Sequence, residues 1–240
     1  MAMMDDLKQA AAEAAAALAE DGMVLGLGSG STATAAVSAI GRRVAQGLRV
    51  TGIPTSENTE ALARSLGIPL SNLDEHSQID LAIDGADEVE RGTLNVIKGR
   101  GGALLEEKLV ASASRRFAIV VDESKLVDRL CPDRQAIPVE VVPFGWKTTA
   151  QRLRSKGAEW TLRMGREGQP FVTDGGHYIL DCSFPPFDSA RELQAQIDGV
   201  VGVVEHGLFL GMATEVIVAR SGAKGVPEIQ ILKPTARSAR

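Results

Sequence analysis

Cysteine, histidine and aromatic side chains are all scarce in this chain of 240 residues. The two cysteines, Cys131 and Cys182, are typical of free thiols in a reducing compartment rather than of a disulfide scaffold. The three histidines, His76, His177 and His206, are scattered and give no metal-ligand spacing. We therefore expect neither a bound metal nor a disulfide framework. Because aromatics make up only 4%, the core is expected to consist of Val, Ile, Leu and Ala.

The chain also lacks a long apolar run. No stretch approaches the roughly 18 residues of a membrane span. The start of the chain, with Asp5 and Asp6, lacks the basic-then-apolar order of a signal peptide. A net charge of -5 argues against a nucleic-acid surface. The sequence thus predicts a cytoplasmic globular protein without membrane or nucleic-acid partners.

A strand, a glycine turn and a helix are predicted near the start of the chain. Residues 23–27 favour a strand, Gly26-Leu-Gly-Ser-Gly-Ser-Thr32 the turn, and the alanine-rich stretch to about residue 46 the helix. Glycines let the backbone approach an anion, and a helix start offers free N–H groups. A phosphate site is one interpretation, and a tight turn with a Ser/Thr helix cap is the other. Ser31 at the third glycine position breaks the dinucleotide fingerprint, and no lysine completes a P-loop.

Acidic residues crowd the end of a later predicted strand, residues 80–83. Asp84 and Asp87 would lie at the carboxyl end of that strand, where open α/β sheets bind ligands. The alternative is a turn with an Asp helix cap. Glu88 and Glu90 follow closely, and we expect both to be solvated.

Lys98 precedes a second glycine loop, residues 99–102, and a helix expected at 103–114. Glu107 has apolar neighbours at helical spacing, so burial could raise its pKa toward that of a useful base. Glu106 has a similar neighbourhood, so periodicity does not choose between the two glutamates. Both could instead simply favour the positive end of the helix dipole.

Two further lysines are each either an anion ligand or a solvated surface charge. Lys8 lies in a helix expected at 5–20, and Lys125 follows the buried-type strand 117–121.

The segment after Cys131 has a different character. We expect strands at 137–142, 159–163, 171–173, 178–182 and 201–205, and helices at 147–156 and 189–197. This order is typical of a small α+β, split βαβ module, and it contains no clustered chemistry. Strands at 216–219 and 228–232 complete the chain.

Taken together, the motifs resemble those of one family, ribose-5-phosphate isomerase of the A type, over nearly the whole chain. The motifs are Gly28-Ser-Gly-Ser-Thr32, Asp84-Gly-Ala-Asp-Glu88, Lys98-Gly-Arg-Gly-Gly-Ala-Leu104, Glu107-Lys108, Asp122-Glu-Ser-Lys125, Pro138-Val-Glu-Val-Val-Pro143 and Gly202-Val-Val-Glu-His-Gly-Leu-Phe209. The resemblance implies interconversion of D-ribose 5-phosphate and D-ribulose 5-phosphate in the pentose phosphate pathway. It also implies that no metal or cofactor is needed and that the protein is a homodimer or homotetramer.

The resemblance further implies an α/β fold, with a Rossmann-like parallel-sheet domain and an inserted, smaller α+β (ferredoxin-like) domain. The predicted boundaries are 1–132 plus 206–240 for the catalytic domain and 133–205 for the smaller one, which would serve oligomerisation.

The resemblance also assigns roles to residues. Glu107 becomes the catalytic base, and Asp84, Asp87 and Lys98 surround the reacting end of the sugar, with Asp84 our candidate for opening the sugar ring. The implied substrate contacts are Lys8, Ser29, Gly30, Ser31, Thr32, Asp84, Gly85, Ala86, Asp87, Lys98, Gly99, Arg100, Gly101 and Lys125. Two residues depart from the common family pattern, Arg100 in place of glycine and Ser29 in place of threonine.

Two other classes of protein fit parts of the pattern. A sugar-phosphate sensor would keep the phosphate loops without needing Asp84, Lys98 and Glu107, but would normally carry a DNA-binding helix pair, for which we expect no spare residues. An enzyme of the CoA-transferase type also uses glycine loops and a glutamate, but no separate motif indicates a CoA site.

Overall fold

The computed structural model of the chain describes residues 2–235, and within them the largest sheet has six strands. In spatial order they are β14 (Pro227–Leu232), β13 (Glu215–Ser221), β6 (Ser114–Asp122), β3 (Ile79–Asp84), β1 (Val24–Leu27) and β2 (Thr51–Pro54). From β13 to β2 all neighbours are parallel, and β14 is antiparallel to β13.

The inner strands of this sheet, β1, β3, β6 and β13, are mostly buried on both faces, which is why they read as apolar runs, whereas the edge strand β14 is mostly exposed. In β6, Phe117, Ile119 and Val121 pack into one core, while Ala118 and Val120 pack into another on the opposite face. Side chains that alternate along a strand thus reach two separate layers of helices.

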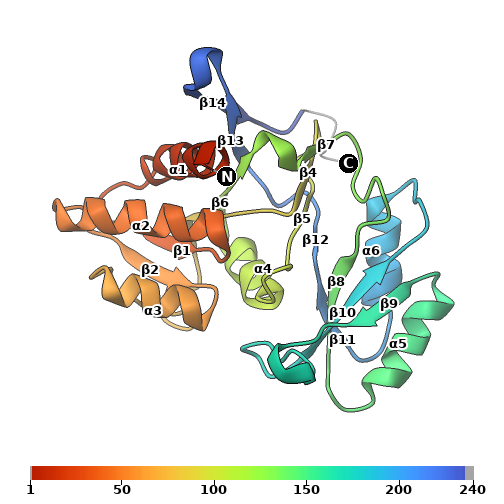
Figure 1. The fold of residues 1–240 in the computed structure, drawn as a ribbon. Coiled ribbons are helices and arrows are strands. Elements are labelled where there is room, and N and C mark those ends of the chain that lie inside the picture. Colours follow the sequence, from red (N-terminus) through yellow and green to blue (C-terminus); the bar gives the residue numbers. More distant parts are fainter. Residues whose placement is uncertain (1, 236–240) are drawn as a thin grey trace.

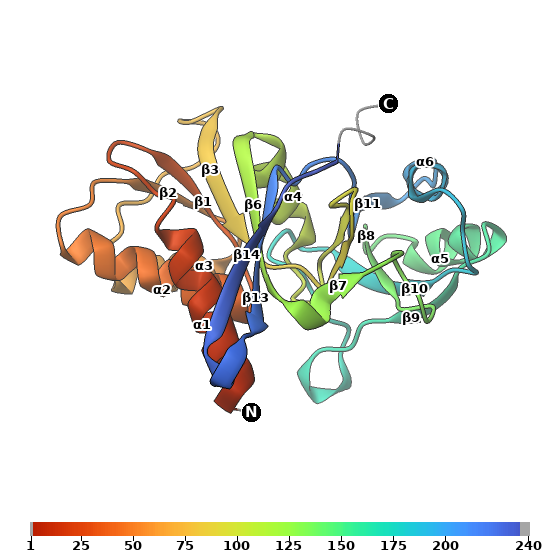
Figure 2. The ribbon, with the colours of Figure 1, turned by 90° about the horizontal axis from the view of Figure 1, so that it is seen from above.

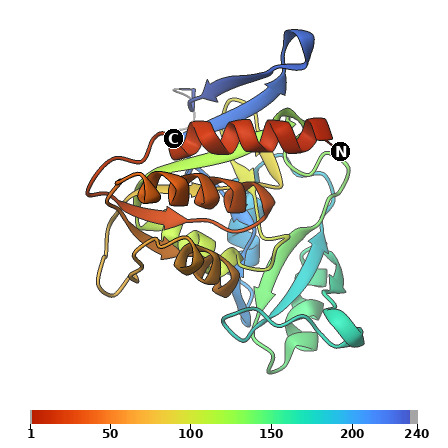
Figure 3. The ribbon, with the colours of Figure 1, turned by 60° about the vertical axis from the view of Figure 1, so that its left-hand side comes forward.

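Helices cover both faces of the sheet. They are α1 (Ala2–Ala16), α2 (Ser31–Ala45), α3 (Glu57–Ser65) and α4 (Leu104–Ser112). Helices α1 and α2 pack side by side, and small side chains such as Ala11, Ala12 and Ala15 let them approach the sheet closely (Figure 3). Helix α4 lies on the opposite face, where Val110 and Ala111 pack against the second core (Figure 2).

A second sheet lies on the other side of α4 (Figure 1). Its strands are β8 (Ile137–Val141), β9 (Glu159–Leu162), β10 (Tyr178–Ser183) and β11 (Val203–His206), in the order β11-β8-β10-β9 and antiparallel throughout. With α5 (Trp146–Ser155) and α6 (Ala190–Asp198) this is the split βαβ arrangement. The predicted fold class is confirmed, whereas the domain boundaries stay a prediction.

Four short strands form a third sheet. In spatial order they are β12 (Leu208–Phe209), β5 (Val96–Ile97), β4 (Glu88–Glu90) and β7 (Leu126–Val127), and the 3₁₀ turns are η1 (Glu123–Lys125), η2 (Arg166–Gly168) and η3 (Ala223–Gly225).

Two expectations from the sequence are wrong. Residues 171–173 form no strand: the N–H of Phe171 donates to the carbonyl of Arg163, that of Thr173 closes a turn on the carbonyl of His177, and the Thr173 hydroxyl donates to Glu140. Glu88 is not solvated but buried, and its carboxylate accepts the backbone N–H of Cys131 at 2.7 Å. Glu90 is half-buried and accepts hydrogen bonds from Thr93 and Asn95.

The strand order reverses between β1 and β3. The chain goes from β1 through α2 to β2 at one edge, and from β3 it proceeds to β6 on the other side. In open α/β sheets the crevice at such a switch point is where ligands bind. Here the residues after β1 are the glycine turn 28–30, and β3 ends at Asp84.

Candidate active site

Asp84 connects the ends of β1 and β3 at the switch point through hydrogen bonds. Its side chain is 2% exposed, and its Oδ1 accepts the N–H groups of Ser29 at 3.1 Å and Gly85 at 2.7 Å. A Cβ atom at Gly28 would lie 2.3 Å from the Asp84 Cγ, so this position requires glycine. The carboxylate therefore holds the glycine turn against the end of β3.

Lys98 joins Asp84 to Glu107. Its Nζ lies 3.0 Å from Asp84 Oδ2 and 3.4 Å from Glu107 Oε1, and it donates to the carbonyl of Gly85 at 2.6 Å. Lys98 and Glu107 are 3% and 4% exposed. The other carboxylate oxygen, Glu107 Oε2, is buried and has no hydrogen-bond partner among residues 2–235. We call Asp84, Lys98 and Glu107 the Lys98 cluster.

Burial dominates the electrostatics of the Lys98 cluster. It raises the pKa of Glu107 to about 8, with Lys98 opposing this shift and Asp84 adding to it. It also raises the pKa of Asp84, against the effect of Lys98 and two backbone N–H groups. Burial would lower the pKa of Lys98, but the two carboxylates outweigh it and the pKa is raised. The cluster thus holds a charged lysine beside a glutamate whose proton is exchangeable near neutral pH.

Glu106 and Glu107 point to different surroundings. Glu106 is half-buried near Glu140, Asp174 and His177, and burial raises its pKa too. It makes no ion pair with Lys98 within the described residues, whereas Glu107 does. The sequence did not distinguish these two adjacent glutamates. The structure does, because different residues surround each side chain.

The second glycine loop forms one wall of the site. Gly99 and Gly102 have φ values of 100° and 90°, a region that disfavours other residues. The N–H of Arg100 donates to Asp87 Oδ2 at 3.1 Å, and its Nε lies 3.9 Å from Asp87 Oδ1. Arg100, the departure from the family pattern, thus contacts one of the predicted site carboxylates.

The first glycine loop opens into the start of α2. Gly30 is the N-cap, with φ 87°, and no side chain caps the helix. The Ser29 hydroxyl instead bonds with Thr55 at 2.7 Å and Ser56 at 3.0 Å. The Ser/Thr cap that was the alternative reading is therefore not formed, and the first N–H groups of α2 stay available for an anion.

These elements surround one cavity of about 140 Å³. It is lined by Lys8, Ser29, Gly30, Ser31, Thr32, Gly85, Ala86, Asp87, Lys98, Gly99, Arg100, Gly101, Glu107 and Lys125. Of the predicted site residues, Asp84 alone is not in the lining, because it lies behind Lys98. The structure thus brings the predicted residues together, and their contact with a substrate stays a prediction.

A larger cavity of about 440 Å³ lies between α3 and α4, on the Glu106 side. Leu70, Leu73 and Leu109 contribute to its lining, and its Arg64 is paired with Glu60 at the surface. Because Lys98, Glu107 and the glycine loops all lie in the smaller cavity, chemistry rather than volume identifies that cavity as the candidate active site.

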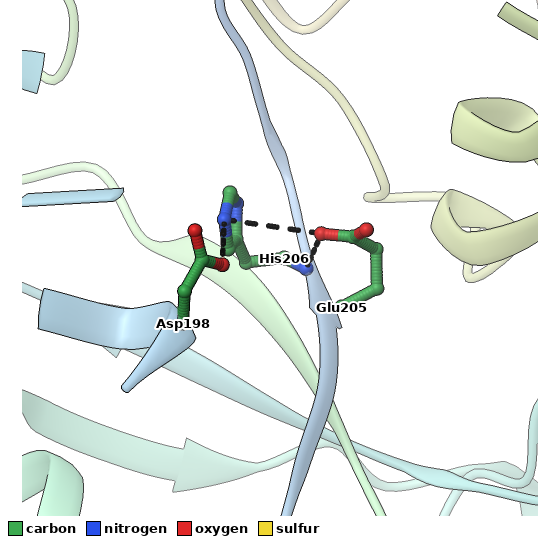
Figure 4. A group of neighbouring side chains, drawn as sticks. All are labelled: Asp198, Glu205 and His206. Carbon is green, nitrogen blue, oxygen red and sulfur yellow. Dashed lines mark hydrogen bonds and ion pairs between the residues drawn. The ribbon is translucent and has the colours of Figure 1, made fainter. Parts of the chain in front are cut away.

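Asp198, Glu205 and His206 form the one group in the described chain with metal-ligand proximity (Figure 4). The N–H of Leu208 donates to His206 Nδ1 at 3.1 Å, so the ring proton lies on Nε2, which donates to Asp198 Oδ1 at 3.0 Å. That proton occupies the lone pair a metal would need.

A lysine pairs with the glutamate of this group. Lys108 Nζ lies 2.6 Å from Glu205 Oε1 and 2.6 Å from the carbonyl oxygen of His206. Burial, together with Lys108, lowers the pKa of His206 to about 4, so its ring is neutral. We call Lys108, Glu205, His206 and Asp198 the Lys108 cluster, a set of paired groups that does not fit a metal ion.

Residues outside the predicted set also reach the site. The Arg163 guanidinium donates to the carbonyls of Gly99 and Arg100, and the Phe209 ring lies 5.8 Å from Lys98 Nζ. Phe209 falls within a family motif, but nothing local to Arg163 indicates a contact with a loop more than sixty residues earlier.

The fold and the cavity together define a class of protein. It is a Rossmann-like α/β protein whose switch point carries a helix N-terminus, two lysines and a buried lysine–carboxylate cluster around one small cavity. Such a site suits acid–base chemistry on a small anionic ligand.

Comparison with known proteins identifies the family. The family model of ribose 5-phosphate isomerase A (phosphoriboisomerase A) matches residues 51–223. Ribose-5-phosphate isomerase A of Gloeobacter violaceus is 56% identical over 97% of this chain and 98% of its own, and that of Synechococcus sp. is 54% identical over 96% and 99%. The chain belongs to the ribose 5-phosphate isomerase A family.

Solved structures agree. The ribose 5-phosphate isomerase A of Methanocaldococcus jannaschii superposes with a TM-score of 0.88 at 43% identity, covering 95% of this chain and 98% of its own. A D-ribose-5-phosphate isomerase in complex with phospho-erythronic acid has the same TM-score at 37% identity, covering 96% and 99%.

Proposed function

We propose that Glu107 carries the proton in the interconversion of D-ribose 5-phosphate and D-ribulose 5-phosphate, the reaction of the family to which the chain belongs. The observation that carries this proposal is the buried Glu107 carboxyl group held beside Lys98 at the cavity; Glu106 Oε2 is also buried and unpartnered, but Glu106 does not line this cavity and makes no ion pair with Lys98 among residues 2–235.

The phosphate would bind at the start of α2. The uncapped N–H groups after Gly30, the hydroxyls of Ser31 and Thr32, and the ammonium groups of Lys8 and Lys125 meet at the cavity. A helix N-terminus together with positive charge favours an anion. This placement leaves the other end of the sugar for Lys98 and Glu107.

Proton transfer follows from the geometry of the Lys98 cluster. Glu107 removes the proton from C2 of the open-chain aldose, and the enediolate that forms carries negative charge on O1. Lys98 and the N–H groups of the second glycine loop stabilise that charge. Glu107 then returns the proton to C1 while the O2 hydroxyl proton moves to O1, which leaves the ketone at C2.

Lys98 has the charge that this step requires. Its ammonium stays protonated because Asp84 and Glu107 raise its pKa. A buried ammonium and preorganised N–H donors can do the work of a Lewis acid, so we propose a reaction that needs neither metal nor cofactor.

Ring opening is better suited to Asp87 than to Asp84. Both Asp84 oxygens are occupied, Oδ1 by two backbone N–H groups and Oδ2 by Lys98. Asp87 accepts the Arg100 N–H with Oδ2, but among the described residues its Oδ1 has only the 3.9 Å contact with Arg100 Nε, and its side chain lines the cavity and is 19% exposed. We therefore reassign the acid–base step at the ring oxygen to Asp87 and give Asp84 the task of orienting Lys98.

The cellular setting is also a proposal. In the described part of the chain no helix has the length and apolar character needed to cross a bilayer. We propose a cytoplasmic homodimer or homotetramer that acts in the pentose phosphate pathway without nucleic-acid or membrane partners. Sedimentation or light scattering of the purified protein would establish the number of subunits.

A direct assay tests the function. The purified chain, treated with EDTA, should convert ribose 5-phosphate to ribulose 5-phosphate, followed by NMR in D₂O. Enediolate chemistry predicts that solvent deuterium appears at C1 of the product in at least part of the molecules. Loss of turnover on EDTA treatment, restored by a divalent metal, would contradict the metal-free mechanism. Complete absence of solvent deuterium at C1 would favour hydride transfer instead.

A further inference from the structure

The second glycine loop is fastened from outside by one side chain of the second sheet. Arg163, which directly follows β9, donates from Nη1 to the carbonyl of Gly99 at 2.9 Å and to the carbonyl of Arg100 at 3.0 Å. One guanidinium therefore fixes two successive peptide groups of a wall of the active site.

Asp181 on β10 sets the direction of that guanidinium. Arg163 Nε lies 3.0 Å from Asp181 Oδ2, and its Nη2 is paired with Asp181 Oδ1. A two-point pair of this kind fixes the plane of the guanidinium as well as its position. The Arg163 side chain is 15% exposed, which also limits competition from water.

Fixing the carbonyls fixes the N–H groups. In a trans peptide the N–H of the next residue points away from the carbonyl oxygen. With the carbonyls of Gly99 and Arg100 on Arg163, the N–H groups of Arg100 and Gly101 face the other way. The Arg100 N–H does reach Asp87 Oδ2, at 3.1 Å, and Gly101 lines the cavity.

The loop needs such a restraint because of its composition. Residues 99, 101 and 102 are glycines, which lose more conformational freedom on ordering than other residues. Within the loop, the N–H of Gly102 donates to the carbonyl of Gly99 at 3.0 Å. Phe171, from the same segment as Arg163, also packs on Gly102, where a Cβ would lie 2.5 Å from the ring.

We infer that Arg163, oriented by Asp181, is a positioning residue for catalysis: it holds the N–H of Arg100 on Asp87 and directs the N–H of Gly101 toward the cavity, where charge develops on the substrate. Arg163 touches neither substrate nor reacting atoms. Its contribution is the preorganisation of donors, which counts in the transition state more than in substrate binding. The inference rests on the proposed isomerisation, which the wild-type assay tests separately.

The test is the turnover of Arg163→Ala with and without methylguanidinium. A loop misplaced by a fraction of an ångström should lower kcat by roughly 10- to 100-fold while KM changes by less than about threefold. Millimolar methylguanidinium should restore a measurable part of kcat, because it can fill the vacated site. Arg163→Lys should remain impaired, since an ammonium cannot bind the aspartate and both carbonyls in one plane.

The matched control is Arg116→Ala. Arg116 makes a similar part-buried pair with Glu215, at 3.1 and 2.7 Å, but lies near the amino end of β6, the edge of the sheet away from the site. The Arg116→Ala variant should have a lower Tm than wild type. Its kcat per folded molecule should be unchanged, and methylguanidinium should have no effect on it.

Two results would overturn the inference. One is a kcat for Arg163→Ala within twofold of wild type, and the other is a loss of kcat that methylguanidinium does not relieve. If Arg163→Ala does not fold, Asp181→Asn provides the same comparison, with an expected loss of roughly threefold to tenfold in kcat at unchanged KM. An unchanged kcat in that variant would equally overturn the inference.

Discussion

Two lysines, the buried Lys98 and the part-buried Lys108, contact the ring of Phe209, and the clusters around them have opposite characters. Lys98 Nζ lies 5.8 Å and Lys108 Nζ 4.8 Å from the ring centroid. In the Lys98 cluster, Glu107 keeps one oxygen unpartnered beside a cavity. In the Lys108 cluster, the lysine is hydrogen-bonded to Glu205 and to the His206 carbonyl, and none of the buried side-chain polar atoms of this cluster lacks a partner within residues 2–235.

The pKa values of the two lysines are also shifted in opposite directions. Two carboxylates outweigh burial and raise the pKa of Lys98, whereas burial prevails and lowers the pKa of Lys108. Similar residue types therefore serve different ends. An incompletely satisfied polar cluster beside a cavity can do chemistry, and a satisfied one stabilises the junction between α4 and β11.

The largest effect is expected from the base. Glu107→Gln removes the proton acceptor but keeps the shape of the side chain, so kcat should fall about a thousandfold with little change in KM. Glu106→Gln is the matched control one residue away and should leave kcat within about threefold of wild type. Steady-state kinetics of both variants measure this difference. Normal turnover in Glu107→Gln, or a thousandfold loss in Glu106→Gln, would show that the base is misassigned.

The second largest effect is expected from the two lysines, which should respond differently to the same substitution. Lys98→Met removes the charge that faces the enediolate, so kcat should fall by about 100- to 1,000-fold. Lys108→Met should instead leave kcat within about threefold and lower stability by about 2 kcal/mol, because it leaves Glu205 unpaired in a part-buried site. Kinetics and denaturant unfolding of the two variants separate the roles. Equal losses of activity in both would remove the distinction between the clusters.

Much of this site could be predicted from the sequence because its parts are local. A strand end, a glycine turn and a helix start consist of consecutive residues. The positions of Ser31, Asp84 and Lys98 could therefore be predicted from the local sequence pattern and the sheet topology. The choice of Glu107 over Glu106 needed the family resemblance, since both have apolar neighbours on α4. What separates them is the packing of distant segments over each face, Lys98 on one side and His177 on the other.

The remaining features depend on contacts between distant residues. Arg163 meets the carbonyls of residues 99 and 100 only because the second sheet packs against the loop. Glu88 is buried only because β4 lies between β5 and β7, two strands too short to be recognised in the sequence. Neither contact produces a periodic pattern in the sequence from which it could be predicted.

The pH dependence of kcat/KM tests the central claim most directly, namely that a buried Glu107 is the base. The base must be ionised, and burial raises its pKa to about 8, so kcat/KM should rise about tenfold per pH unit below that value and level off above it. Asp84 adds to the raised pKa, so in Asp84→Asn the rise should move to lower pH, and in Glu106→Gln it should stay in place. A profile that is flat down to about pH 5, or one displaced by Glu106→Gln rather than by Asp84→Asn, would contradict the account.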